Sequence, residues 1–273
     1  MEDTSNSESL ICFYCHPPDL KNNEYEVDQD FEQQTAVMLV IKIDTWKRNI
    51  EDRTKGLRWD DKSLINVLQR FALYNKDSPE SFKLTEEFKF LPQFIFYLRR
   101  SLVLQNFNAS PDEVAQFKTV LLKENVSNSM TMIQPILLSY NPDEPDFSPV
   151  SLEAENMKPD RVLLLDAYFF ICIWYGEDVC SWREAGYQNQ PEYENIKNML
   201  DNPVDYAQNL IMERMPVPRF VSADYNSGQE RLIKSVLDPS LEGTQDFKEG
   251  YFVSDDVTLK VFNEFLIKKV VSS

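Results

Sequence analysis

The sequence has 273 residues, enough for one large domain or two ordinary ones, and its 42% apolar and 27% charged residues are typical of a globular protein. Its 28 basic and 45 acidic residues give a formal net charge of −17. Such an acidic chain repels nucleic-acid phosphates and anionic lipid head groups. We therefore expect no nucleic-acid binding and only indirect association with a membrane.

The scarcity of glycine and histidine excludes further classes of protein. The sequence has six glycines, and none of them completes a GxGxxG or GxxxxGK[ST] loop that could enclose a phosphate in backbone amides. The single histidine, His16, lies in a polar stretch. One poorly anchored imidazole builds neither a Ser-His-Asp triad nor a multi-histidine metal site. A self-contained hydrolase of these kinds is not expected.

The beginning of the sequence carries half of a zinc-site spacing. Cys12 and Cys15 form a CxxC pair directly before His16, but a closed zinc site needs four ligands, and no second pair follows. We expect reduced thiols here, a small core residue at Cys172, and no metal cofactor. Residues 1–28 are polar, acidic and aperiodic, so they are predicted to form a tail without a secretory signal.

Residues 29–128 show the apolar periodicity of helices. One candidate helix starts at Phe31, and a second has its buried stripe on Leu64, Leu68, Phe71 and Ala72. A third segment, 88–98, is bent or restarted by a proline. The fourth begins at 110–113, where serine, proline and glutamate have the spacing of a capping box. The pattern predicts a helical domain.

The pattern changes near residue 130. The runs 162–165 and 167–175 are continuous apolar segments that are typical of buried central strands. Helices are predicted over 177–185, over 191–200, from Asn202 onward and, at the end of the chain, over 255–271. The second half is therefore predicted to be an α/β domain with a mixed sheet, followed by one terminal helix.

Several motifs follow one another along the sequence, at 57–59, 74–77, 88–100, 110–113, 133–137, 182–188, 191–195, 216–220, 229–231, 238–240 and 255–259. In this order they resemble the C-terminal part of the GTPase-activating subunit family of the COPII inner coat. The resemblance implies an α+β architecture with a helical domain at 29–128 and a gelsolin-like domain at 129–256. A C-terminal helix at 257–273 is then expected to pack on the helical domain. The zinc finger, trunk and β-sandwich that precede this region in the family have no counterpart in the sequence.

The family match also implies a function for one arginine. In the family, an arginine of the gelsolin-like domain enters the active site of a Sar-type small GTPase, and Arg231 occupies that position, with Gln229 beside it as a partner-contacting residue. A guanidinium can donate two parallel hydrogen bonds to the charge that develops during phosphoryl transfer. GTP and magnesium would belong to the GTPase, so the chain itself needs neither and is not expected to be an enzyme.

The sequence departs from the family pattern next to that arginine. Glu230 stands where the family usually has a small residue, and Asn226 and Ser227 replace a glycine pair. A carboxylate at this position can pair with Arg231 or repel phosphate. The asparagine–serine pair is expected to stiffen the loop.

The resemblance as a whole implies a COPII coat component in transport from the endoplasmic reticulum to the Golgi. Its partners would be the Sar-type GTPase and the cargo-binding and outer-coat subunits, and its place the cytoplasmic side of the endoplasmic reticulum and COPII vesicles. An alternative is a non-catalytic interaction module that binds coat partners or proline-rich segments. Actin binding by the gelsolin-like domain is a third hypothesis, which rests on fold analogy alone.

Overall fold

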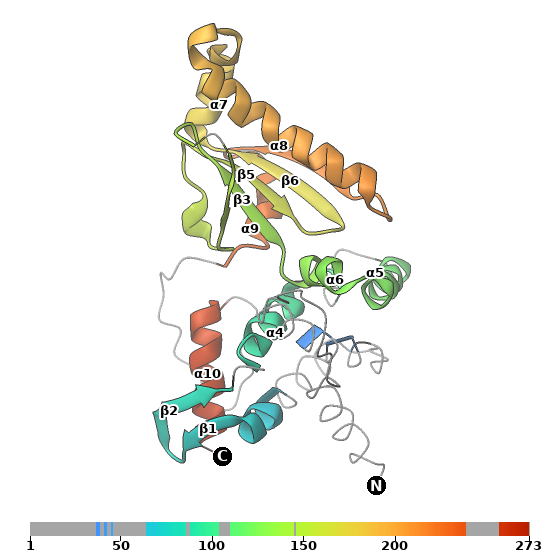
Figure 1. Ribbon diagram of the computed structural model, residues 1–273, viewed down its shortest axis with the longest axis vertical. Coiled ribbons are helices and arrows are strands. Elements are labelled where there is room, and N and C mark those ends of the chain that lie inside the picture. The colour runs from blue at the N-terminus through green and yellow to red at the C-terminus, as the bar shows by residue number, and fades with distance from the viewer. Residues whose placement is uncertain are drawn as a thin grey trace, which may run out of the picture. The chain divides into compact units, whose positions relative to one another are not determined.

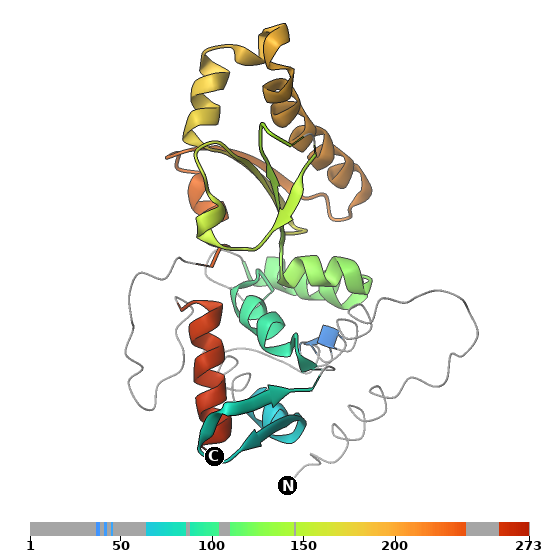
Figure 2. The ribbon, with the colours of Figure 1, turned by 60° about the vertical axis from the view of Figure 1, so that its left-hand side comes forward.

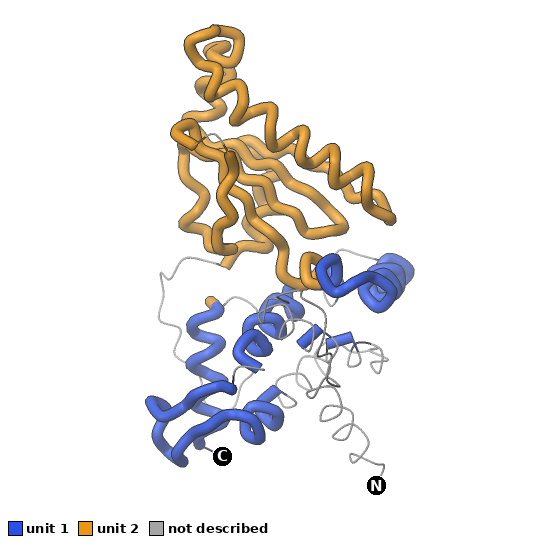
Figure 3. Tube along the Cα trace, in the orientation of Figure 1, with its two compact units in different colours: residues 1–129, 250–253, 259–273 blue, residues 130–249, 254–258 orange. Residues whose placement is uncertain are grey.

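The computed structural model describes residues 37–38, 41–42, 45, 64–85, 88–103, 110–144, 146–238 and 257–272. The predicted tail, Cys12, Cys15, His16, Phe31 and residues 239–256 lie outside this set. The chain divides into two compact units, residues 1–129, 250–253 and 259–273 in the first, and residues 130–249 and 254–258 in the second (Figure 3). No helix among the described residues is long and apolar enough to cross a membrane.

The first unit combines helices with one β-hairpin. Its labelled elements are β1 (Ala72–Asn75), β2 (Ser78–Leu84), α4 (Leu91–Arg100), α5 (Pro111–Lys123) and α10 (Leu259–Val271), and α6 (Val126–Ile133) runs across the boundary between the units. The terminal helix α10 contacts β2 and α4 (Figure 2). In that contact the rings of Phe96 and Phe262 lie 5.5 Å apart, and the Asp77 amide donates to the Val271 carbonyl at 3.3 Å.

Two predictions for this unit are confirmed. At Ser110, the hydroxyl accepts a hydrogen bond from the Glu113 amide, and the Glu113 carboxylate accepts one from the Ser110 amide. This is the predicted capping box, with Pro111 in the first turn of α5. The proline at 92 lies in the first turn of α4, so it restarts the third helical segment rather than bending it.

The predicted second helix is wrong at its end. Residues 64–71 are helical, but Ala72, which we placed on the helical stripe, begins β1. β1 and β2 pair as antiparallel strands around a turn in which Asp77 adopts a positive φ of 62°. Aspartate tolerates this left-handed conformation, so the turn can close and the chain leaves the helix.

The second unit is built on a five-stranded mixed sheet in the order β4-β3-β5-β6-β7 (Figure 1). The strands are β3 (Ile136–Tyr140), β4 (Ser148–Val150), β5 (Val162–Asp166), β6 (Phe170–Tyr175) and β7 (Arg219–Asp224). All neighbours are antiparallel except β6 and β7, which are parallel. The predicted central strands and the α+β class with a mixed sheet are thereby confirmed.

Helices cover both faces of this sheet. The other elements are α7 (Glu177–Glu184), α8 (Glu194–Glu213) and α9 (Glu230–Lys234). α8 packs Ile196, Met199 and Ala207 into one core with Ile173 and Tyr175 of β6. Because side chains alternate along a strand, Trp174 points to the opposite face, where it meets α9.

The two helices predicted from 191 to beyond 202 are in fact one. α8 runs without interruption through Pro203, which lies inside the helix. A proline in a helix interior removes one backbone hydrogen bond and costs about 3 kcal/mol. Here the buried residues on both sides of Pro203 pack on the sheet, and this burial outweighs the local preference for a break.

Candidate partner-facing site around Arg231

The predicted site residues lie at the end of β7 and on the short helix α9. After Asp224 the chain makes a turn in which the Ser227 amide donates to the Asp224 carbonyl at 3.0 Å and Asn226 has a positive φ of 56°. Asparagine is among the few side chains that tolerate this conformation, so the turn can form without a glycine at this position. The turn places Gln229 as the residue before α9.

Both predicted site residues, Gln229 and Arg231, are exposed. Gln229 precedes α9 without forming a side-chain cap, and Arg231 lies in the first turn of the helix. In the part of the chain that the structure describes, no ion pair or hydrogen bond holds the Arg231 guanidinium. The side chain therefore faces away from its own sheet and is open to another molecule.

Glu230 does not pair with Arg231, which was the first of the two alternatives in the sequence analysis. Its side chain is only 8% exposed and points toward the sheet instead of pairing with Arg231. Its carboxylate accepts hydrogen bonds from Trp174 Nε1 at 3.1 Å and from Lys234 Nζ at 2.8 Å. Because both oxygens have donors from other residues and the group is buried, the pair with Arg231 is not formed, whereas repulsion of phosphate stays a prediction.

A shallow pocket of about 370 Å³ opens beside α9. Its lining combines apolar side chains with the ion pair of Glu230 and Lys234 and comprises Ala154, Met157, Trp174, Tyr225, Glu230, Lys234 and Leu237. The segment after α9 closes one side of it, because the Asp238 amide donates to the Leu152 carbonyl at 2.6 Å and the Ala154 amide donates to the Asp238 carbonyl at 3.0 Å. The segment that follows α9 is thus held by backbone hydrogen bonds.

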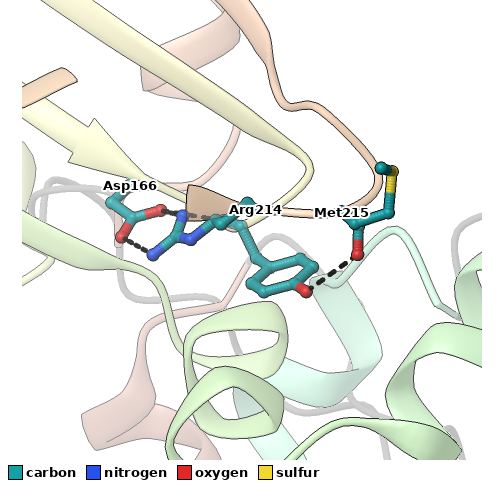
Figure 4. Close-up of polar contacts among 4 residues, drawn as sticks. Asp166, Arg214 and Met215 are labelled. Carbon is teal, nitrogen blue, oxygen red and sulfur yellow. Dashed lines mark hydrogen bonds and ion pairs between the residues drawn. The ribbon is translucent and has the colours of Figure 1, made fainter. Parts of the chain in front are cut away.

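A second polar cluster secures the opposite end of the domain. The Arg214 guanidinium binds both oxygens of Asp166, with Nη1–Oδ1 at 2.5 Å and Nη2–Oδ2 at 2.7 Å (Figure 4). It lies over the ring of Tyr168, whose hydroxyl donates to the Met215 carbonyl at 3.3 Å. Burial alone would lower the pKa of Arg214, but the hydrogen bonds and charge of Asp166 raise it above its ordinary value. This cluster fixes the connection between α8 and β7.

Sequence reasoning missed the residues that support these side chains, although signals existed. Glu230 and Lys234 have the i, i+4 spacing of a helical ion pair. Trp174 lies in an apolar run, and a buried indole N–H needs an acceptor. Asp166 interrupts the same apolar region, and a buried carboxylate requires a partner. In each case the type of residue indicates that a partner is needed, but the sequence does not indicate which residue of the chain the partner is.

Comparison with known proteins defines the class of fold. The crystal structure of the human COPII-coat protein Sec24c matches 87% of this chain with a TM-score of 0.63 and 15% sequence identity. The match covers 31% of that chain, so this sequence spans about a third of it. The α+β fold of this chain is therefore similar to that of a portion of this COPII-coat protein.

A family model matches the first part of the chain. Residues 32–131 match the Sec23/Sec24 helical domain. The predicted resemblance to the COPII inner coat is confirmed at this level. A Thorarchaeota 2DGel3 protein in complex with rabbit actin matches with a TM-score of 0.28 and 23% identity over 37% of this chain and 44% of its own. That likeness is too low to support actin binding.

Proposed function

We propose that this chain acts in the COPII coat as an activator of a Sar-type small GTPase, to which it supplies Arg231 in trans. The observation that supports the proposal is the exposed guanidinium, which has no ion pair or hydrogen bond among the described residues and lies on a helix that is bound to Trp174 through Glu230. The neighbouring carboxylate, which could have neutralised it, is buried and occupied.

The chemistry of GTP hydrolysis explains the choice of arginine. Negative charge spreads over the γ-phosphoryl oxygens and the leaving oxygen in the transition state. A planar and always charged guanidinium stabilises this charge with parallel hydrogen bonds, and an arginine finger contributes on the order of 10³–10⁵ in rate. The nucleophilic water, magnesium and the phosphate-binding loop belong to the GTPase. The chain needs only to present one side chain at a fixed place.

Single-turnover GTP hydrolysis by the cognate Sar-type GTPase tests the proposal. The wild-type chain is expected to accelerate hydrolysis, and Arg231→Ala is expected to abolish the acceleration while the affinity for the GTPase, measured separately, changes little. Arg219→Ala removes another exposed positive charge of the same domain and is the matched control. Equal acceleration by wild type and Arg231→Ala would contradict the proposal.

A non-catalytic interaction module is the second candidate. It is favoured by exposed apolar side chains near the connection between α8 and β7, namely Met212, Met215, Val217 and Phe220. The Tyr168 hydroxyl and the Arg214–Asp166 pair hold the backbone of this connection. In this case the chain would capture coat partners or proline-rich segments without any change in the rate of hydrolysis.

The charge of the chain bears on where it acts. We propose that it lies in the cytoplasm, peripheral to the endoplasmic reticulum and COPII vesicles, and that coat partners recruit it there. A chain of net charge −17 has no attraction to an anionic leaflet. Flotation with anionic liposomes should therefore require the GTP-loaded GTPase, and flotation of the chain alone would contradict recruitment through partners.

A further inference from the structure

The direction of Arg231 follows from which other residues of α9 face the sheet. Glu230 is 6% exposed and Ile233 is fully buried, so these two residues define the inner face of the helix. Successive residues of a helix lie about 100° apart. Arg231 is therefore turned away from the inner face, whereas Lys234 lies at its border and reaches back to Glu230.

We propose that Glu230, bound to Trp174 of β6, is the positioning residue of Arg231. The proposal rests on the function proposed above for Arg231 and adds the means by which the guanidinium is aimed. Glu230 would not touch the nucleotide. It would fix the rotation of α9 about its axis, and with it the direction in which the next side chain leaves the helix.

α9 needs such an anchor because it cannot hold its own orientation. It has five residues, and Gln229 gives it no side-chain cap. Isolated helices of this length are not stable in water, so tertiary contacts decide whether the turn forms and how it lies. Without Glu230, Ile233 would be the one fully buried side chain of the helix. A single apolar contact is not directional and does not fix the rotation of a short helix about its axis.

The Trp174–Glu230 hydrogen bond supplies the second fixed point, and it is directional. Trp174 is 2% exposed and belongs to a strand that is paired on both sides, so its indole N–H has a fixed place. A hydrogen bond to a buried carboxylate is strong, and its loss leaves a buried donor without an acceptor. A side chain that is displaced by 1 Å from a reacting phosphoryl group can cost about 10²-fold in rate.

Hydrogen exchange of residues 226–238 tests the anchor without any GTPase. Glu230→Ala and Trp174→Phe, which each remove one partner of the hydrogen bond, are expected to speed exchange of the Leu232 and Ser235 amides by about tenfold. Glu230→Gln keeps an acceptor for Trp174 and should stay within about threefold of wild type. Glu192→Ala removes an exposed carboxylate elsewhere in the domain and is the control. Unchanged exchange in both Glu230→Ala and Trp174→Phe would overturn the proposal.

GTPase kinetics test the link to Arg231. Glu230→Ala should lower the maximal single-turnover rate by about 10–100-fold while the half-saturating concentration of the chain changes little, and Glu230→Gln should restore most of the rate. In an Arg231→Ala background, Glu230→Ala should have no further effect, because there is no guanidinium left to aim. A rise of the half-saturating concentration with an unchanged maximal rate would instead indicate a contact residue and overturn the proposal.

The experiments distinguish a failure of the proposed function of Arg231 from a failure of the positioning role of Glu230. If Arg231→Ala leaves the acceleration intact, or if the wild type gives none, the proposed function fails, and hydrogen exchange alone decides whether Glu230 anchors α9. If Arg231→Ala abolishes the acceleration but Glu230→Ala does not reduce it, the role of Arg231 as an arginine finger is supported and the positioning role of Glu230 is wrong.

Discussion

Arg214 and Asp166, which are 48 positions apart in the chain, form an ion pair in which the guanidinium binds both carboxylate oxygens. Asp166 ends β5, and Arg214 directly follows α8. The Arg214 side chain is 11% exposed and that of Asp166 is 3% exposed, so water reaches neither charge freely. The pair therefore fixes where the long helix ends relative to the sheet, and the connection to β7 starts from a defined point.

We expect Arg214→Ala to lower the free energy of unfolding by about 3–5 kcal/mol, because it leaves the Asp166 carboxylate buried without a partner. Arg214→Lys should recover only part of this loss, since an ammonium cannot bind both oxygens in a fork. Denaturant unfolding of the three proteins measures the difference.

Replacement of both charges gives the complementary test of this pair. In the double variant Asp166→Leu/Arg214→Met neither charge is left unpaired, and apolar replacement of a buried pair is often neutral. The double variant should be more stable than Arg214→Ala alone. A double variant that is as unstable as the single one would show that packing around Arg214, and not the charge on Asp166, carries the effect.

Gly176 lies between β6 and α7 at a point where the backbone of another segment comes very close. A Cβ atom added there would lie 2.2 Å from the Pro159 carbonyl oxygen and 2.6 Å from the Lys158 carbonyl oxygen, and these two oxygens belong to backbone that cannot give way easily. We expect Gly176→Ala to destabilise the domain by about 3 kcal/mol or to prevent folding.

Gly228, before α9, provides the matched control for this substitution. A Cβ atom there meets nothing within 4 Å, so Gly228→Ala should change stability by less than about 0.5 kcal/mol. Thermal unfolding of both variants checks the contrast. A Gly176→Ala protein as stable as wild type would mean that the Pro159 segment can move aside.

The sequence predicted elements well where a local rule acts alone. The capping box at Ser110 and Glu113 needs only residues that are three positions apart, and the runs of β5 and β6 are apolar because both faces of these strands are covered. In such places the local preference of the sequence agrees with the fold. The start of α5 and the strands β5 and β6 could therefore be predicted from the sequence alone.

The predictions failed where distant contacts overrule a local preference. Pro203 indicates a helix break, but the packing of α8 on the sheet holds one continuous helix. Ala72 continues a helical stripe in the sequence, but pairing with Leu84 places it in a strand. Glu230 has an arginine as its neighbour in sequence, and its hydrogen-bond partner Trp174 is 56 residues away. A pattern of neighbouring residues cannot predict a contact between residues that are so far apart in the sequence.

The capping box predicts a dependence of stability on pH. Hydrogen bonds from the Ser110 backbone and side chain lower the pKa of Glu113 below its ordinary value of 4.5. In this range the unfolded chain binds more protons than the folded one, so the contribution is present above pH 4.5 and is lost as the pH falls through the folded pKa. The stability difference between wild type and Glu113→Gln should therefore shrink from pH 6 toward acid pH. A difference that does not change with pH would contradict the role of the carboxylate.

Burial makes the two described cysteines differ in reactivity. Cys172 is fully buried in β6, and burial raises the pKa of its thiol to about 12. Cys180 is partly exposed, and burial raises the pKa of its thiol less far. Since the thiolate is the reactive form, an alkylating reagent at pH 8 should label Cys180 before Cys172, which should react only after unfolding. Mass spectrometry of the labelled peptides gives the order, and early labelling of Cys172 would show that this strand opens locally.

Arg231→Lys separates the shape of the finger from its charge. Lysine keeps the positive charge and can still approach the GTPase, but it has no planar fork with which to bind two phosphoryl oxygens at once. If Arg231 stabilises the transition state, Arg231→Lys should lose most of the acceleration, on the order of 10²-fold or more, and should resemble Arg231→Ala in single-turnover hydrolysis. If Arg231 only attracts the GTPase through its charge, Arg231→Lys should match wild type and only Arg231→Ala should be impaired. Raising the salt concentration would then weaken the wild type and Arg231→Lys equally, because attraction between exposed charges is screened.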